Sequence, residues 1–360
     1  MTWVTTVGGV EPVINATPPT TLRSMCTPRV STRNHRQIDP CGAPWGEDED
    51  NMTPPEKSPI TRVRHVGLAV PNFAEAVEFY RTMWGLEIVA EDSDVAFFGT
   101  PAHPEQYIVR IRKDEDKRLD LIAFAAESAD AVDALAARLG TADIALASEP
   151  DALNTPGGGY GFRFFDPDGR LIEVSADVAG RPSRPLAPGE SIPQKLSHVV
   201  VNAPDVLATK RFYEQHLGFK LSDWLEDKMC FMRVRTDHHI FAIGQGPHVS
   251  LNHISFEMRG IDEYMRGTGR LIRSGQDPLW GPGRHGAGNN TFSYFTDATG
   301  NVVEYTTELE KIEDDDAWVP RRFEATPEES DQWGTGGSIE PMIPAMLNDP
   351  DKGLWTKAPI

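Results

Sequence analysis

The sequence of 360 residues has few cysteines, few basic residues and no long apolar run. Its three cysteines, Cys26, Cys41 and Cys230, are too few and too scattered for a disulfide framework or a zinc cluster. No apolar run approaches the roughly 20 residues that cross a bilayer, and the N-terminus lacks the basic and apolar regions of a secretory signal. The formal net charge of -19 argues against nucleic acid or anionic membrane as a partner. We therefore expect a cytoplasmic protein that binds neither.

Residues 1–59 also lack a periodic apolar pattern. They contain nine prolines and an acidic run at Glu47–Asp50, a composition that is typical of a segment without its own core. Met52 opens a second plausible start of the protein. We therefore predict that residues 1–59 form a disordered or irregular N-terminal extension, or that the part before Met52 is an upstream start that the cell does not use.

From Val63 onward the apolar residues become regularly spaced. The run VRHVGLAV predicts a strand, and residues 73–83 predict an amphipathic helix. Further predicted elements are strands at 95–98, 107–111 and 119–124, a helix at 129–139 and a hairpin at 162–176.

The same order of elements returns in the second half, so the chain is a tandem duplication. Corresponding residues stand 133 positions apart early in each copy and 131 apart in the final hairpin, as in the pairs His65 and His198, Tyr80 and Tyr213, Asp166 and Asp297, and Glu173 and Glu304. We predict two similar domains, at residues 60–180 and 195–312. The acidic, proline-rich residues 313–360 predict an irregular tail packed over the second domain through Trp318, Trp333 and Trp355.

Three potential metal ligands lie in strand-like surroundings of the second copy: His198, His253 and Glu304. Glu304 stands in an apolar run, where a carboxylate without a partner would be costly to bury. Two imidazoles and one carboxylate can occupy one face of a divalent metal and leave other positions open, as in non-haem iron(II) oxygenases. The first copy keeps the first histidine and the glutamate but has Leu121 in place of His253. The duplication therefore predicts a metal in the second domain alone.

The tandem copies, the three ligands and the final hairpin resemble the vicinal oxygen chelate superfamily, and within it the two-domain type I extradiol catechol dioxygenases. The resemblance covers residues 63–310. It implies an α+β fold of tandem duplicated βαβββ modules in two similar domains, the glyoxalase/bleomycin-resistance/extradiol dioxygenase fold. It further implies iron(II), with manganese(II) as the alternative, in the second domain only.

The family's signature near its third ligand is a glycine-rich loop ending in histidine, an aliphatic residue followed by tyrosine, and an acidic turn with proline before the glutamate. Here these places hold GPGR and His285, Ser293 followed by Tyr294, and the turn Asp297–Gly300. Ser293 and Ala298 depart from the pattern, which indicates a divergent subgroup. The first part of this stretch, from Gly281 to His285, reads as a loop.

The resemblance also implies roles for three polar residues. His239, in the run DHHIFAI, matches the family's acid-base histidine, although a slip of one residue would exchange it with His238, whose side chain points to the opposite face of the strand. His285 and Tyr294 match the residues that hydrogen-bond the bound diol and the reacting oxygen.

The function implied is extradiol cleavage of a catechol-type substrate by O2 to a ring-opened semialdehyde, by a homo-oligomer. Three alternatives remain open: a 4-hydroxyphenylpyruvate-type 2-oxo acid dioxygenase, a glyoxalase-like isomerase or epimerase, and a metal-free small-molecule-binding protein. The sequence leaves the ring substituents open, because it does not place the cavity-wall candidates, namely Trp280, His248, Phe241 and the stretch after Asp316.

Overall fold

The computed structural model describes residues 57–352. Within that range no helix is long and apolar enough to cross a bilayer. Residues 1–56 of the N-terminal extension predicted from the sequence lie outside the described residues, and so does Trp355.

The first domain is one mixed sheet of eight strands, in the order β2-β3-β4-β1-β5-β8-β7-β6. It consists of two modules of strand, helix and three strands, whose first strands, β1 and β5, pair antiparallel at the centre of the sheet. The elements in chain order are β1 (Ile60–Val70), α1 (Phe73–Glu78), η1 (Phe79–Met83), β2 (Glu87–Glu91), β3 (Val95–Gly99), β4 (Val109–Lys113), β5 (Arg118–Ala126), α2 (Ala129–Thr141), β6 (Leu146–Ala152), β7 (Tyr160–Phe165) and β8 (Leu171–Ala176).

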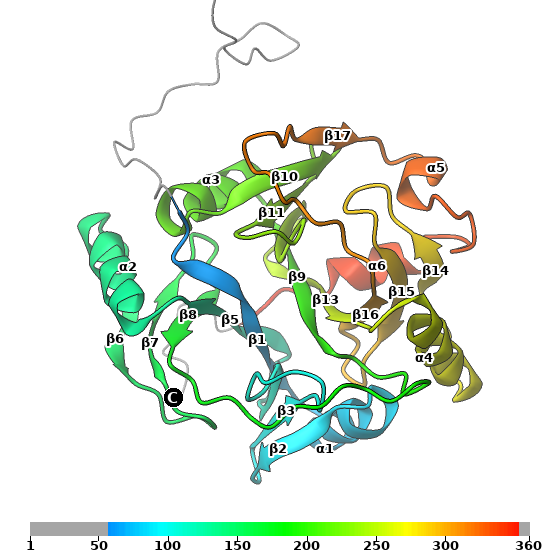
Figure 1. Cartoon of the computed structure of the whole chain (residues 1–360), viewed down its shortest axis with the longest axis horizontal. Coiled ribbons are helices and arrows are strands. Elements are labelled where there is room, and N and C mark those ends of the chain that lie inside the picture. Colours follow the sequence, from blue (N-terminus) through cyan, green and yellow to red (C-terminus); the bar gives the residue numbers. More distant parts are fainter. Residues whose placement is uncertain (1–56, 353–360) are drawn as a thin grey trace, which may run out of the picture. The chain divides into compact units, whose positions relative to one another are not determined.

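The second domain repeats this plan in a sheet of nine strands, in the order β14-β15-β16-β13-β9-β12-β11-β10-β17. Its central strands β9 and β13 correspond to β1 and β5 (Figure 1). The elements in chain order are β9 (Lys195–Ala203), α3 (Val206–Leu217), β10 (Lys220–Leu225), β11 (Met229–Arg233), β12 (Phe241–Gln245), β13 (Ser250–Glu257), α4 (Ile261–Arg273), β14 (Trp280–Arg284), β15 (Thr291–Thr296), β16 (Val302–Thr306), β17 (Arg321–Phe323), α5 (Pro327–Ser330) and α6 (Met342–Leu347). The tandem βαβββ fold predicted from the sequence is thus confirmed.

Helix α2 illustrates how the sequence builds these modules. The side chain of Ser128 caps its N-terminus by accepting a hydrogen bond from the backbone N–H of Ala131. Val132, Leu135 and Leu139 are buried at helical spacing, so one face of α2 packs on the sheet.

The two domains contact one another through a pair of reciprocal hydrogen bonds. The hydroxyl of Tyr80 donates to Asp297 Oδ2 at 3.0 Å, and the hydroxyl of Tyr213 donates to Asp166 Oδ2 at 3.2 Å. Tyr80 and Tyr213 are corresponding residues of the duplication, and so are the two aspartates. The repeated tyrosines and aspartates therefore join the first helical segment of each domain to the final hairpin of the other domain.

Several elements differ from the sequence-based expectation. Strands β2 and β6 are absent from the sequence-based prediction. Strand β6 reads LASEPDA, with no alternation of apolar and polar residues, so its sequence does not indicate a strand. The stretch from Gly281 to Arg284, predicted as a loop, lies in the irregular strand β14. Glycine is required at Gly281, where φ is +110° and an added Cβ would lie 2.5 Å from the backbone oxygen of Phe292.

The tail also differs in part, since the segment predicted as irregular carries β17, α5 and α6. Strand β17 pairs parallel with the edge strand β10. The indole N–H of Trp318 donates to the backbone oxygen of Ser222 at 2.8 Å, which fixes the tail to the second domain.

Candidate metal centre

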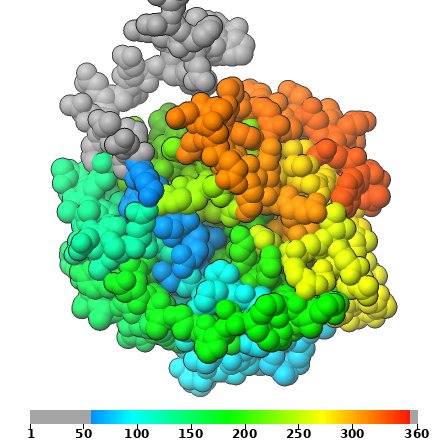
Figure 2. Space-filling model, in the orientation of Figure 1, coloured from blue at the N-terminus to red at the C-terminus, as the bar shows by residue number. Residues whose placement is uncertain are grey.

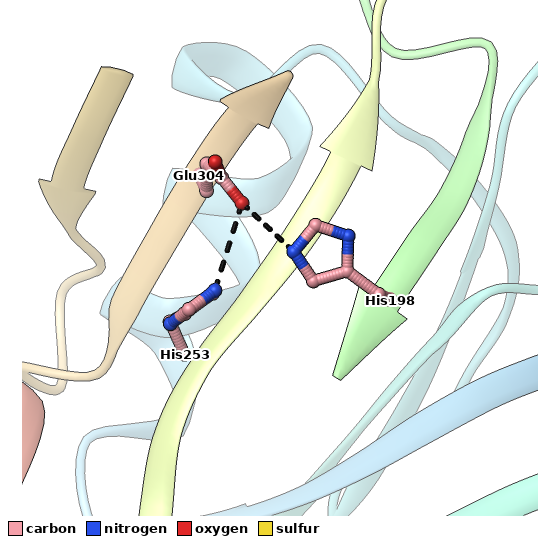
Figure 3. Close-up of side chains that lie close together, drawn as sticks. All are labelled: His198, His253 and Glu304. Carbon is pink, nitrogen blue, oxygen red and sulfur yellow. Dashed lines mark ion pairs between the residues drawn. The ribbon is translucent and has the colours of Figure 1, made fainter. Parts of the chain in front are cut away.

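His198, His253 and Glu304 lie on three neighbouring strands, β9, β13 and β16. Residue Ser255 of β13 pairs with His198 on one side and with Glu304 on the other, and His253 stands two residues before it on the same face. Figure 3 shows the three side chains converging from these strands. We call this group the triad. Its side chains are buried, at 2 %, 6 % and 0 % exposure.

The distances within the triad suit a single divalent cation. Nε2 of His198 lies 3.1 Å from Oε2 of Glu304, and Nε2 of His253 lies 3.6 Å from the same oxygen. One ligand atom from each residue falls within 4.8 Å of the others. Metal-ligand bonds of about 2.1 Å meeting at right angles place ligand atoms about 3 Å apart.

The buried polar atoms of the triad also lack other partners. Both carboxylate oxygens of Glu304 and Nε2 of His253 make no hydrogen bond of regular geometry among the described residues. Burial lowers the pKa of His198 and of His253 to about 3 and raises the pKa of Glu304. Neutral imidazoles beside a carboxylate that needs a counter-charge fit Fe(II) or Mn(II).

Neighbouring amides and a hydroxyl orient the ligand histidines. Asn252 Oδ1 lies 2.8 Å from Nδ1 of His253, so that nitrogen carries the proton and Nε2 presents its lone pair to the metal position. The amide N–H of Asn252 donates to Asn202 Oδ1, which fixes the orientation of the Asn252 side chain. Ser197 Oγ lies 3.1 Å from Nδ1 of His198.

A cavity of about 150 Å³ opens at the triad, lined by His198 and His253. One side is formed by Leu225, Met229 and Phe231 of β10 and β11, which we call the hairpin wall. A second apolar part of the lining is formed by Ile339, Met342 and Met346 on and before α6, which we call the tail wall. Figure 2 shows the C-terminal segment, in orange and red, as a continuous part of the surface beside the yellow residues of the second domain.

Helix α6 is fixed to the central strands by hydrogen bonds to its backbone. Asn202 Nδ2 donates to the backbone oxygen of Met346 at 2.7 Å, and Ser250 Oγ donates to that of Leu347 at 2.7 Å. Asn202 also orients Asn252, so a chain of amides connects the tail wall to His253.

The two adjacent histidines face different surroundings. His239 lines the cavity, with its ring 4.2 Å from that of His198. His238 is fully buried, and its Nε2 lies 3.0 Å from Asp223 Oδ2. The Nδ1 atoms of His238 and His239 lie 2.9 Å apart. The geometry therefore favours His239, and not His238, as the residue that meets a substrate.

His285 and Tyr294 also lie together at the cavity. Nε2 of His285 is 2.8 Å from the hydroxyl of Tyr294, and Nδ1 of His285 is 3.0 Å from the backbone oxygen of Ser330. A carbonyl oxygen can only accept, so Nδ1 carries the proton and Nε2 accepts the tyrosine proton. Burial lowers the pKa of His285, consistent with a neutral ring, and raises that of Tyr294.

Of the three wall candidates named from the sequence, Trp280 lines the cavity. His248 instead lies 3.0 Å from the backbone oxygen of Asn348, and Phe241 is buried in the core against Tyr213. Sequence reasoning had not identified Asn252 or the individual residues of the tail wall. The amide next to His253 was visible in the sequence, whereas nothing in the tail indicates which residues reach the cavity.

The corresponding place in the first domain has no triad. Ala123 pairs with His65 on one side and with Glu173 on the other, as Ser255 does in the second domain, and Leu121 stands where His253 stands. Arg163 occupies the place of Tyr294. Its Nε donates to Glu173 Oε2 at 2.9 Å, so the guanidinium group neutralises the buried carboxylate.

Comparison with known proteins gives a family match to both domains. The model of the Glyoxalase/Bleomycin resistance protein/Dioxygenase superfamily matches residues 62–174 and 195–305. Metapyrocatechase 2 of Cupriavidus necator is 27% identical over 295 residues, covering 76% of this chain and 89% of that protein. The manganese-dependent 2,3-dihydroxybiphenyl 1,2-dioxygenase of Geobacillus genomosp. 3 is 24% identical over 283 residues, covering 72% and 89%.

Solved structures resemble the chain over most of its length. The Mn(II)-bound glyoxalase from Novosphingobium aromaticivorans is 45% identical with a TM-score of 0.78, covering 83% of this chain and 98% of that one. Homoprotocatechuate 2,3-dioxygenase from Arthrobacter globiformis has a TM-score of 0.72 at 22% identity, covering 84% and 95%, which establishes similarity of fold.

Proposed function

This chain belongs to the Glyoxalase/Bleomycin resistance protein/Dioxygenase superfamily, and from that premise we propose that it is a metal-dependent extradiol dioxygenase. The reaction inserts both atoms of O2 into a catechol-type ring beside the hydroxyl-bearing carbons and gives a ring-opened semialdehyde. The similarity to metapyrocatechase 2 and to the manganese-dependent dihydroxybiphenyl dioxygenase supports this reaction.

One observation carries the proposal: the triad shares its cavity with three further polar side chains. His239, His285 and Tyr294 line the same cavity as His198 and His253. A protein that only stored a metal, or only bound a ligand, would not need an acid-base group and a hydrogen-bonding pair beside open metal positions.

The proposed cofactor is Fe(II), with Mn(II) as the alternative, held by the triad. When bound, the metal would supply Lewis-acid binding of the diol and the electron transfer that activates O2. Two imidazoles and a carboxylate bind both Fe(II) and Mn(II), so the choice of Fe(II) is itself proposed.

His239 is the proposed acid-base residue. Burial lowers its pKa well below the usual value, so the ring is neutral and can accept a proton from a substrate hydroxyl group. Nδ1 of His239 lies 2.9 Å from Nδ1 of His238, whose Nε2 lies 3.0 Å from Asp223 Oδ2. This contact orients the His239 ring at the cavity, where it can take up a proton from the substrate and return it later.

Tyr294 and His285 are the proposed positioning pair. The proton of the Tyr294 hydroxyl is held by His285 Nε2, and the backbone oxygen of Ser330 holds the His285 ring in that tautomer. The tyrosine oxygen then lies in a fixed place beside the triad, where it can orient a bound diol. The apolar walls exclude water from the reacting ring.

A glyoxalase-type isomerisation of a 2-oxoaldehyde thiol adduct is a second candidate. The 45% identity to a Mn(II)-bound glyoxalase favours it. Such an isomerase needs a further carboxylate beside its metal. Among residues 57–352, Glu329 is the one carboxylate that the cavity lining contains, and its side chain accepts a hydrogen bond from the backbone N–H of Glu324. This arrangement favours ring cleavage.

One experiment separates these functions. Protein purified without oxygen is analysed for metal, then mixed in air with catechols while oxygen uptake and a yellow product are followed. About one metal per chain with both signals is expected, and removal of the metal with a chelator should abolish them. Metal without cleavage, together with turnover of methylglyoxal and a thiol, would contradict the proposal. The predicted homo-oligomer and cytoplasmic location are tested by light scattering and by cell fractionation.

A further inference from the structure

The cavity has two apolar parts besides the polar residues near the triad. The hairpin wall contributes one and the tail wall the other. Met342 is buried, and it packs in a small cluster with Trp280 and Tyr294, so the tail wall continues directly from the tyrosine beside the triad. A substituent on a ring bound at the triad would therefore lie between apolar side chains.

Among residues 57–352, no lysine or arginine side chain lines this cavity. Arg284, at the end of β14, is committed elsewhere: its guanidinium lies 2.5 Å from Glu308 and 5.7 Å from the ring centre of Trp333. The acidic residue in the lining away from the triad is Glu329, whose side chain is held by the backbone N–H of Glu324. The lining residues among 57–352 therefore offer no cation to an anionic substituent.

We propose that the cavity selects catechols with an uncharged, apolar ring substituent and rejects those that carry an ionised carboxylate. This inference rests on the proposed ring cleavage and names its substrate class. An ionised carboxylate between these walls would lose its hydration without gaining a cation. An alkyl or ester group would instead bury apolar surface, which strengthens binding by about fourfold for each methylene group.

The size of the cavity limits the substituent. A cavity of about 150 Å³ is on the order of the volume that holds one benzene ring. The ring of the substrate therefore fills most of the enclosed space, and the substituent extends along the tail wall towards Ile339, which is 36% exposed at the rim. Short alkyl groups gain contacts there, and the gain ends where the wall ends.

Binding of matched diols to the Fe(II)-loaded protein under argon tests the inference without turnover. Calorimetry compares 3,4-dihydroxyphenylacetate with its methyl ester, and catechol with its 4-methyl, 4-ethyl and 4-propyl derivatives. We expect the ester to bind at least about 100-fold more tightly than the acid, and the alkyl series to tighten stepwise. Equal binding of acid and ester would overturn the charge preference.

The same samples are then opened to air, which separates the two claims. Tight binding of the ester without ring cleavage would overturn the proposed function and leave the charge preference standing. Binding of neither the acid nor any neutral diol would overturn both.

Substitution in the tail wall provides a second test. Met346→Arg places a guanidinium group beside the substituent and should move the acid-to-ester binding ratio at least about tenfold towards the acid. Met346→Leu adds no charge and should leave that ratio unchanged. Ile339→Arg, at the more exposed rim, gives the same readout should Met346→Arg fail to fold. An unchanged ratio in a folded arginine variant would contradict the location of the substituent.

Discussion

The two domains build the same place in the sheet and neutralise its buried carboxylate in different ways. In the first domain Glu173 is paired with Arg163, a cation that belongs to the chain. In the second domain Glu304 faces two neutral histidines, and tyrosine stands where the arginine would be. A carboxylate in an apolar sheet needs a positive charge in both cases.

This difference shows how the same arrangement of strands can carry either a structural ion pair or a metal site. Arg163 places its own charge on Glu173, so this carboxylate needs no metal ion. With Tyr294 in place of that arginine the cation is absent, and His253 supplies a further lone pair. Leu121 in the first domain lacks that lone pair. Two positions beside the carboxylate therefore distinguish the domains, and two of the predictions below, His253→Leu and Arg163→Met, change them one at a time.

The largest effect is expected when the second domain is given the residue of the first, in His253→Leu. Two remaining ligands would hold the metal poorly, so we expect far less than one metal per chain and a loss of ring cleavage of at least ~10³-fold. Metal analysis after gel filtration and oxygen uptake measure both. His65→Phe in the first domain is the matched control and should retain metal and turnover. A His253→Leu protein with a full complement of metal would show that the triad is misassigned.

The next effect concerns His239, which stands two residues before strand β12. The corresponding residue in the first domain is Tyr107, two residues before strand β4. His239→Ala should keep the metal and lower the rate of ring cleavage by about 10²- to 10⁴-fold, because the proton acceptor is lost. Single-turnover kinetics on metal-saturated protein measure this rate. Tyr107→Ala serves as the control in the first domain. Full turnover in His239→Ala would remove this residue from the mechanism.

A third change removes the intrinsic cation of the first domain. Arg163→Met leaves Glu173 buried without a counter-charge, and we expect a loss of about 3–5 kcal/mol in the free energy of unfolding. Urea unfolding measures it, with ring cleavage per folded molecule as the check that the second domain is intact. The double variant Arg163→Met/Glu173→Leu removes both charges and should recover most of the loss. A single variant as stable as the wild type would mean that Glu173 is neutralised in another way.

The smallest effect is a dependence of stability on pH. Burial and three nearby arginines hold the pKa of His65 well below 6.5. The unfolded chain therefore binds a proton below about pH 6.5 that the folded chain does not, and stability falls as the pH falls, by up to about 1.4 kcal/mol per pH unit. His65→Phe keeps a ring beside Tyr107 and should weaken this slope between pH 6.5 and 5. Unfolding curves with parallel slopes in both proteins would contradict a neutral His65.

The sequence was sufficient to predict the repeated modules, and the three proposed metal ligands that it indicated lie close together in the structure. Glu173 and Glu304 stand at fixed offsets in a repeated pattern, and a repeat preserves the pairing of strands, so corresponding residues fall at the same place in each sheet. The roles of the six predicted site residues remain predictions. The structure groups Glu304 with His198 and His253, and it places His239, His285 and Tyr294 in the lining of the cavity that these two histidines also line.

What the sequence did not reveal depends on contacts between distant segments. Strand β6 reads as a polar loop, because it is an edge strand whose side chains are largely exposed. The tail wall depends on Asn202 holding the backbone of Met346, a contact between residues 144 positions apart. Arg163 was not identified as the counter-charge of Glu173, although the hairpin predicted at 162–176 pairs these two residues.

The position of the tail wall in the chain has a consequence for protein synthesis. The chain up to Glu304 leaves the ribosome before Met342 and Met346 do. Until α6 packs against the central strands, the side of the cavity that it forms is missing, and a metal ion has an open route to the three ligands from there.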